Sequence, residues 1–265
     1  MMFQSRRSII VLLLIVALIP ATAGASNLAN PAIAIAEARA AIGLSYHLGG
    51  YTITNDSVPI ILNRINARFS FAPVKWLNFG VDAGATQVEV GADTTPTDTF
   101  GVFHGNYGIS GGAHLRASTP FFFNDIMAIV GLAQGTYFSS ENKYGAVYGG
   151  LDAIGALGPQ FHIKGFGYIT VGPMLYYISG TNKSSEEKTG YYSNISNLRG
   201  WLAIDFFPKM GALSSGKTYI SLEVSASPLA DYGTRVPVRE FSVSLAVGTI
   251  TKRLYGEETD VEWEP

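Results

Sequence analysis

The chain has 265 residues, enough for one large all-β domain or two smaller ones. It contains no cysteine, which excludes disulfides, thiolate metal sites and a lipid-modified N-terminal cysteine. Its formal charge of −2 gives no reason to expect a nucleic-acid partner, and charged residues make up only 14 % of the chain, against about 25 % in an ordinary soluble domain.

Residues 1–25 have the organisation of a secretory signal peptide. Two arginines precede an apolar run from Ile9 to Ile19, which is shorter than the roughly 20 residues of a membrane-spanning helix. Pro20 ends the run, and small residues follow as far as Ala25. We therefore expect Sec-dependent export and cleavage after Ala25. The mature chain is then secreted, periplasmic or in a bacterial outer membrane.

Residues 26–40, SNLANPAIAIAEARA, form an N-terminal periplasmic segment in this interpretation. The alanines permit a short helix that acts as a plug or anchor. A loose tail before the first strand is the alternative that we adopt.

Ten segments of the mature chain alternate apolar and polar residues with a period of two, as strands do. They are 41–51, 60–71, 76–90, 102–118, 126–138, 146–157, 163–178, 197–207, 217–227 and 238–251. The alternation slips near Gln87, which predicts a bulge. Segment 126–138 is apolar on both faces at its start, so the pattern does not assign its faces.

The connections between these segments alternate in length. Those at 72–76, 119–125, 157–160 and 208–217 are tight or contain proline. The longer, polar ones are GYTITNDSV, GADTTPTDTF, SSENKYGA, SGTNKSSEEKTGYYSNIS and SPLADYGTRVP. Short turns at one end with long polar loops at the other are typical of an outer-membrane barrel.

The two faces of these segments differ in kind. In 76–90, Leu77, Phe79 and Val81 share one face, while Asn78 and Asp82 share the other. Across the segments, the second face combines small polar residues with eight charged ones: Arg64, Arg68, Asp82, Arg116, Asp152, Arg199, Asp205 and Glu223. A small closed barrel turns such a face inward, where charges must pair because an unpaired buried charge is costly. We therefore expect a lumen-facing charge network, structural or pore-lining, whose pairing depends on a register that the sequence does not show.

Aromatic residues gather at the ends of the segments. Those beside the short turns are Phe69, Phe71, Trp76, Phe121, Phe122, Phe123, Phe206 and Phe207. Those beside the long loops are Tyr137, Phe138, Tyr144, Tyr148, Tyr176 and Tyr177. This placement predicts two aromatic girdles at the membrane interfaces.

The stretch PVKWLNFGVDAGA, residues 73–85, combines a turn, Trp-Leu and an outward–inward strand. On this motif the chain from 41 to 251 resembles the small bacterial outer-membrane β-barrel proteins of 8–12 strands. The resemblance implies a closed antiparallel up-and-down transmembrane barrel, with ten strands as the first choice and eight or twelve as alternatives. It also implies outer-membrane lipid, lipopolysaccharide and the barrel assembly machinery as partners. Residues 252–265 depart from the family pattern as an acidic periplasmic tail, either a dock for a periplasmic partner or, as we expect, a solvated end.

Catalytic chemistry has one candidate in the sequence. His104 lies near a long loop with Asp93 and Asp98, which puts a base and two carboxylates at the outer rim. Polar loop residues are the alternative that we adopt. His47 and His114 are expected to point inward, and no histidines have a metal-ligand spacing, so no catalytic residue, metal or cofactor is assigned.

We therefore expect a non-enzymatic outer-membrane barrel that acts as a narrow pore or as a structural barrel presenting surface loops. A barrel of this size has an interior largely filled by side chains, which excludes wide general diffusion. Two alternatives remain open: a barrel hydrolase acting at the extracellular rim, and a soluble secreted β-barrel or β-sandwich binder.

Overall fold

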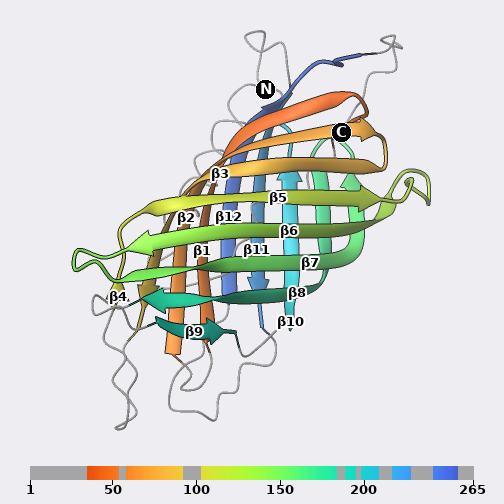
Figure 1. Ribbon diagram of the computed structural model, residues 1–265. Coiled ribbons are helices and arrows are strands. Elements are labelled where there is room, and N and C mark those ends of the chain that lie inside the picture. The colour runs from red at the N-terminus through yellow and green to blue at the C-terminus, as the bar shows by residue number, and fades with distance from the viewer. Residues whose placement is uncertain are drawn as a thin grey trace, which may run out of the picture.

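The computed structural model describes residues 35–53, 58–91, 103–183, 189–194, 198–208, 217–227 and 241–255. Every regular element among them is a β-strand, and ten strands close into an antiparallel barrel (Figure 1). These strands are β1 (Arg39–Ile53), β2 (Val58–Val74), β3 (Leu77–Val90), β5 (Gly108–Ser118), β6 (Met127–Glu141), β7 (Val147–Ile163), β8 (Gly167–Lys183), β10 (Leu198–Phe206), β11 (Lys217–Ala226) and β12 (Phe241–Ile250). The predicted ten-stranded up-and-down barrel is confirmed.

Two pairings close the sheet on itself. The first and last strands pair from Ala41↔Ile250 to Gly49↔Ser242. Strand β8 pairs with β10 from Leu175↔Leu198 to Gly167↔Phe206. All other barrel neighbours are consecutive in the chain, which is the up-and-down order. Among the described residues, no helix is long and apolar enough to cross a membrane.

Two short strands lie beside the barrel. Strand β4 (Phe103–His104) pairs with the end of β3. Strand β9 (Thr189–Ser193) pairs with β8 over 179–183, beyond the point where β8 leaves β10. The sequence predicted 102–107 as the start of a barrel strand and 189–193 as loop. Both predictions were wrong, and the barrel strand in the first case begins at Gly108.

The two ends of the barrel differ in their connections. We call one end of the barrel the turn end. It contains the β2–β3 turn at 75–76, the β5–β6 connection at 119–126 and the β7–β8 turn at 164–166. We name loop end the opposite end, where β1 joins β2, β3 joins β5 and β11 joins β12. Strand β1 begins and β12 ends at the turn end, where the Thr251 amide donates to the Ala40 carbonyl at 2.8 Å.

Outward and inward side chains alternate as the sequence predicted. On β3, Phe79 and Val81 are exposed, while Asn78 and Asp82 are buried. The outward face is apolar around the barrel: Ile109 is 72 % exposed and Leu44 is 65 % exposed, with no protein covering them. A continuous apolar exterior of this kind marks a surface that meets an apolar partner or a membrane.

The predicted slip near Gln87 does not occur. Strand β3 keeps its alternation through Val88 and Val90, which are both buried inside the barrel. What changes is polarity, because near the loop end the inward residues become apolar while Gln87 and Glu89 face outward. In the sequence alone, this exchange of polarity looks the same as a shift of the inward–outward alternation by one residue, and we interpreted it as such a shift.

The predicted turn at 157–160 was also wrong. Strand β7 continues to Ile163, and the chain reverses at 164–166. Pro159 lies within the strand, where the β7–β8 ladder has no register pairs at 157–159 and resumes at Gln160↔Thr170. Because proline has no amide hydrogen to donate, a gap in the ladder is what allows it inside a strand.

The aromatic residues divide between the two faces. Phe69, Trp76 and Phe123 at the turn end, and Tyr137 and Tyr177 at the loop end, point outward and are exposed. The predicted girdles were wrong in part, because several of their members are instead buried: Phe138, Tyr148, Tyr176 and Phe207. Position near a strand end does not by itself tell which face an aromatic residue occupies.

The residues just before β1 pack against the barrel. Ile35 is 4 % exposed, Ala38 is fully buried, and the Ala38 amide donates to the Ala72 carbonyl at 2.7 Å. The loose tail that we expected is therefore wrong for residues 35–38, which lie at the turn end as a plug would. Tyr255, in the predicted acidic tail, donates from its hydroxyl to the Pro73 carbonyl at 2.9 Å. The remaining predictions for 1–34 and 256–265 fall outside the described residues.

Candidate functional site: the charged interior of the barrel

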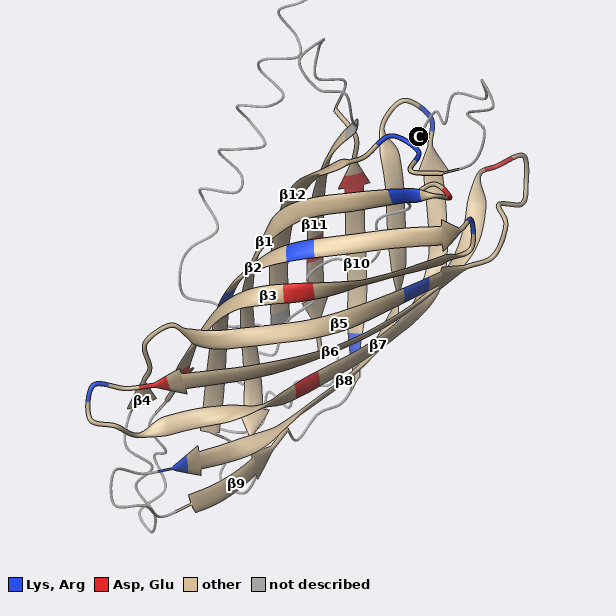
Figure 2. Ribbon diagram, turned by 45° about the horizontal axis from the view of Figure 1, so that its top comes forward, with Lys and Arg blue, Asp and Glu red and all other residues tan. Residues whose placement is uncertain are grey.

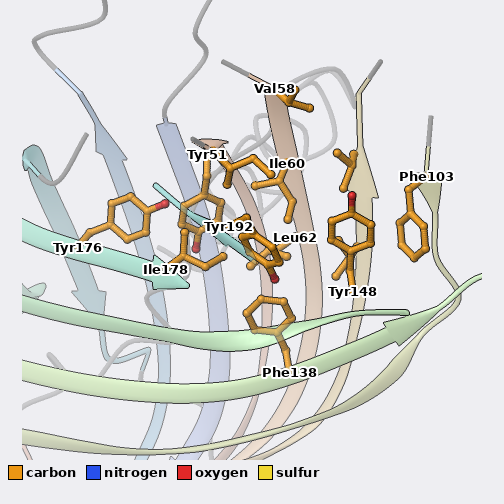
Figure 3. Close-up of a cluster of buried hydrophobic side chains, with 13 residues drawn as sticks. Tyr51, Val58, Ile60, Leu62, Phe103, Phe138, Tyr148, Tyr176, Ile178 and Tyr192 are labelled. Carbon is orange, nitrogen blue, oxygen red and sulfur yellow. The ribbon is translucent and has the colours of Figure 1, made fainter. Parts of the chain in front are cut away.

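The interior of the barrel contains three apolar clusters with polar side chains between them. The loop-end cluster joins side chains from opposite walls, among them Tyr51, Leu62, Phe138, Tyr176 and Tyr192 (Figure 3). The turn-end cluster consists of Ile35, Ala41, Ala72, Tyr168, Phe207, Tyr219, Ala246 and Ile250. The lateral cluster, on the wall from β6 to β10, consists of Val130, Leu132, Ile154, Ala156, Met174, Trp201 and Ala203. The lateral cluster also explains why 126–138 has two apolar faces, since its inward residues pack there.

The structure places all eight predicted charged residues inside the barrel. Each is at most 3 % exposed, and they are spread over six of the ten barrel strands (Figure 2). Their pairing follows from the register, in which arginines and carboxylates from different strands come to face one another.

Arg64 lies at the centre of one group. Its Nη2 is 3.1 Å from Asp152 Oδ2 across the lumen, and its Nε donates to Thr86 Oγ1 at 2.7 Å. The guanidinium also lies over the Phe138 ring, with 5.6 Å between the guanidinium carbon and the ring centroid. The pair therefore links the walls of β2 and β7, which are far apart in the sequence.

A second group contains Arg68, Asp82, His114 and Ser70. Arg68 Nε donates to Asp82 Oδ1 at 2.7 Å, so Arg68 is the partner of Asp82 that the sequence left open. The other carboxylate oxygen, Oδ2, lies 3.0 Å from His114 Nδ1. On the far side of the imidazole ring, His114 Nε2 is 2.8 Å from Ser70 Oγ. All four residues are nearly inaccessible.

Glycines on the inner face of β3 bring these side chains together. Gly80 is the register partner of Ser70 on β2 and of His114 on β5, so both lie beside a position that has no side chain. The imidazole crosses this space, and a Cβ at Gly80 would lie 2.6 Å from His114 Nε2. Gly84 has the same role four residues along the strand, where Ser110 Oγ donates to Asn66 Oδ1 at 3.0 Å.

The other charged residues bind different neighbours. Arg116 Nη2 donates to Gln160 Oε1 at 2.9 Å, and Asp205 Oδ1 accepts from Ser221 Oγ at 2.5 Å. Arg199 Nη2 donates to the Gly50 carbonyl at 2.9 Å. Its guanidinium carbon lies 4.4 Å from the centroid of one tyrosine ring in the loop-end cluster and 5.4 Å from another. Glu223 is buried beside Trp201.

The histidines separate into interior and rim positions. His47 Nδ1 lies 2.7 Å from Ser244 Oγ inside the barrel. His104 is exposed on β4 as the register partner of Glu89, and His162 Nδ1 lies 3.3 Å from the Asp125 carbonyl near the turn end. The carboxylates expected near His104, at 93 and 98, fall outside the described residues. Within the described part of the chain, no group of three or more metal-ligating side chains occurs.

Sequence reasoning missed the hydrogen-bonded chain from Ser70 through His114 to Asp82. The alternation placed the three residues on the polar face, but they lie on three strands whose register the sequence does not show. Glycine at 80 was the available signal, because it leaves room across the strand. No protein-family model matches the chain, and no curated protein matches it.

Proposed function

We propose that this protein is an integral outer-membrane barrel with a closed lumen, which acts as a structural barrel presenting its loops and does not form an open pore. The observation that carries the proposal is the inversion of the barrel: its exterior is apolar and exposed, while its charged side chains are buried within. A soluble barrel or sandwich has the opposite arrangement, because its exposed face contacts water.

The connections support an orientation. In barrels of the outer membrane, short turns face the periplasm and longer loops face outward. The turn end would then be periplasmic, and 35–38 and 252–255, which lie there, would be periplasmic with it. Outer-membrane lipid and lipopolysaccharide would contact the exterior, and insertion would use the barrel assembly machinery.

The clusters in the lumen favour a structural role over a pore. Leu62 and Phe138 in the loop-end cluster are fully buried, and so is Ala72 in the turn-end cluster. An aqueous channel requires polar lining that water can reach, whereas the eight interior charges are at most 3 % exposed. Apolar side chains therefore separate the charged interior from both openings.

Cell fractionation, gel mobility and planar-bilayer recordings test the proposal. The native protein should fractionate with the outer membrane and run as a compact species in mild detergent before heating. It should give no stable conductance steps. Small steps should appear when both ends are opened, by Leu62→Ala/Phe138→Ala in the loop-end cluster together with Tyr168→Ala/Tyr219→Ala in the turn-end cluster. The matched control, Leu44→Ala/Phe69→Ala/Tyr137→Ala/Tyr177→Ala, removes outward side chains of the same kinds and should give no conductance.

Each measurement can contradict a different part of the proposal. A protein that remains in the soluble fraction without a heat-dependent shift is not a membrane barrel. Stable conductance from the native protein would show that the lumen is open.

A further inference from the structure

The side chains of Ser70, His114 and Asp82 are hydrogen-bonded in series and have the geometry of an activated nucleophile. A carboxylate only accepts hydrogen bonds, so at the 3.0 Å contact with Asp82 the proton lies on His114 Nδ1. With the imidazole neutral, Nε2 has a free lone pair and accepts from the Ser70 hydroxyl at 2.8 Å. A nucleophile, a base and a group that orients the base are thereby in line, which is the arrangement that activates serine in unrelated folds.

Arg68 binds the carboxylate end of this group. Its Nε contact at 2.7 Å fixes the Asp82 carboxylate, while its buried Nη1 has no hydrogen-bond partner among the described residues. Arg68 precedes Ser70 by two residues, so both side chains point into the lumen from the same strand. Arg68 therefore holds Asp82 and, through it, the imidazole, while the Ser70 hydroxyl lies at the opposite end of the ring.

The surroundings of Ser70 indicate what the site would accept. Ala41 is its register partner on β1, and Ala72 is the next inward residue on β2. Both belong to the turn-end cluster, so the hydroxyl lies where the polar layer meets an apolar one. An apolar acyl group would meet the cluster side, with its carbonyl carbon toward the Ser70 hydroxyl.

The turn-end cluster also covers the site. Ile35, from the residues before β1, belongs to the same cluster. The backbone there is held by two hydrogen bonds of 2.7 Å, from the Ala38 amide to the Ala72 carbonyl and from the Leu254 amide to the Ala38 carbonyl. A small ester would therefore reach Ser70 from the turn end by displacing Ile35.

We propose that Ser70, His114 and Asp82 form an acyl-transfer site for small carboxylic esters of apolar acids, reached from the turn end. Ser70 Oγ bonds to the ester carbonyl carbon while its proton passes to His114 Nε2. The carbon–alkoxy bond then breaks, and the alcohol leaves with that proton. Water hydrolyses the acyl-serine and releases the acid. Asp82 acts as a positioning residue, since it orients the ring without touching the ester.

This inference goes beyond the proposed structural role and departs from our expectation of a non-enzymatic barrel. Its test uses the folded full chain in detergent, so it does not depend on location or conductance. An alkyl fluorophosphonate, which reacts with activated serines, should label one site, and peptide mass spectrometry should place the label on Ser70. Ser70→Ala should abolish labelling. Ser110→Ala, the matched control at the other glycine crossing, should label as the native protein does.

The role of the base is tested by rates. His114→Gln should slow labelling by about 100-fold or more, the contribution typical of a general base. In the native protein the labelling rate should rise with pH as the imidazole loses its proton, and Asp82→Asn should alter that profile. Ile35→Ala should accelerate labelling by several-fold if the route is from the turn end.

Three results would overturn the proposal. The first is a folded native protein that stays unlabelled. The second is a labelling rate that is the same in folded His114→Gln. The third decides the matter if that variant does not fold: a label that peptide mass spectrometry places on a residue other than Ser70. An unchanged rate in Ile35→Ala would show that the turn end is not the route.

Discussion

Removing the carboxylate of Asp152 tests how the barrel holds its interior charges. Arg64 Nη2 lies 3.1 Å from Asp152 Oδ2, and both side chains are at most 1 % exposed. At that separation, with an effective dielectric constant of about 20, the attraction of two unit charges is about 5 kcal/mol. Asp152→Asn keeps the shape but leaves the guanidinium without its counter-charge, which costs about 3–5 kcal/mol when a buried pair is broken. The ratio of folded to unfolded protein should fall at least about a hundredfold.

The double variant Arg64→Met/Asp152→Leu should recover most of this loss, because replacing both charges with apolar residues is often neutral or stabilising. Urea unfolding in lipid vesicles, followed by tryptophan fluorescence, measures the free energies. Leu151→Val, at the outward neighbour, is the control that changes no charge. The reasoning fails if Asp152→Asn stays within about 0.5 kcal/mol of the native protein, or if the double variant is as unstable as the single one.

Three further predictions concern β3. Phe79→Arg should impair insertion into vesicles, since an arginine facing lipid near the midplane costs about 2–4 kcal/mol, whereas Thr86→Ser, at an inward position of the same strand, should insert normally; gel mobility before heating measures both. Val81→Cys should react with a lipid-soluble thiol reagent only, and Asp82→Cys with neither a lipid-soluble nor a water-soluble reagent while the barrel is folded; lipid-side labelling of Asp82→Cys would mean that the faces are reversed. Gly80→Ala should lower the unfolding free energy by about 1–3 kcal/mol, because its Cβ would overlap both the Phe69 carbonyl oxygen and the imidazole of His114. At Gly155 the nearest atom to a new Cβ is 3.9 Å away, so Gly155→Ala should stay close to native.

The alternation of residue types was sufficient to predict the fold and the charged residues of the lumen, although not its apolar clusters. A period of two assigns each residue to one face of a strand. A face that combines Asp82 and Arg68 with small residues fits the inside of a small barrel. Strand number followed from the ten segments. These inferences succeed because they depend only on neighbours along the chain.

The remaining features depend on neighbours in space. Pro159 was interpreted as part of a turn because the sequence does not show that its partner strand lacks ladder pairs there. Phe138 and Tyr176 were assigned to the girdle because an aromatic residue near a strand end is compatible with either face. The contact between Ser70 and His114 required the register of two separate strand pairs, which no pattern along one strand contains.

The glycines of β3 have a consequence for how this fold would be inferred from related sequences. Ser70 and His114 touch although β2 and β5 do not pair, and Asn66 and Ser110 do the same across Gly84. Substitutions at each pair would be selected together, and the resulting covariation would join strands that are second neighbours. A strand order deduced from that covariation would place β2 beside β5 and omit β3. In a barrel with interior glycines, covariation between two positions can arise from side-chain contact across a glycine in the lumen as well as from strand pairing within the sheet.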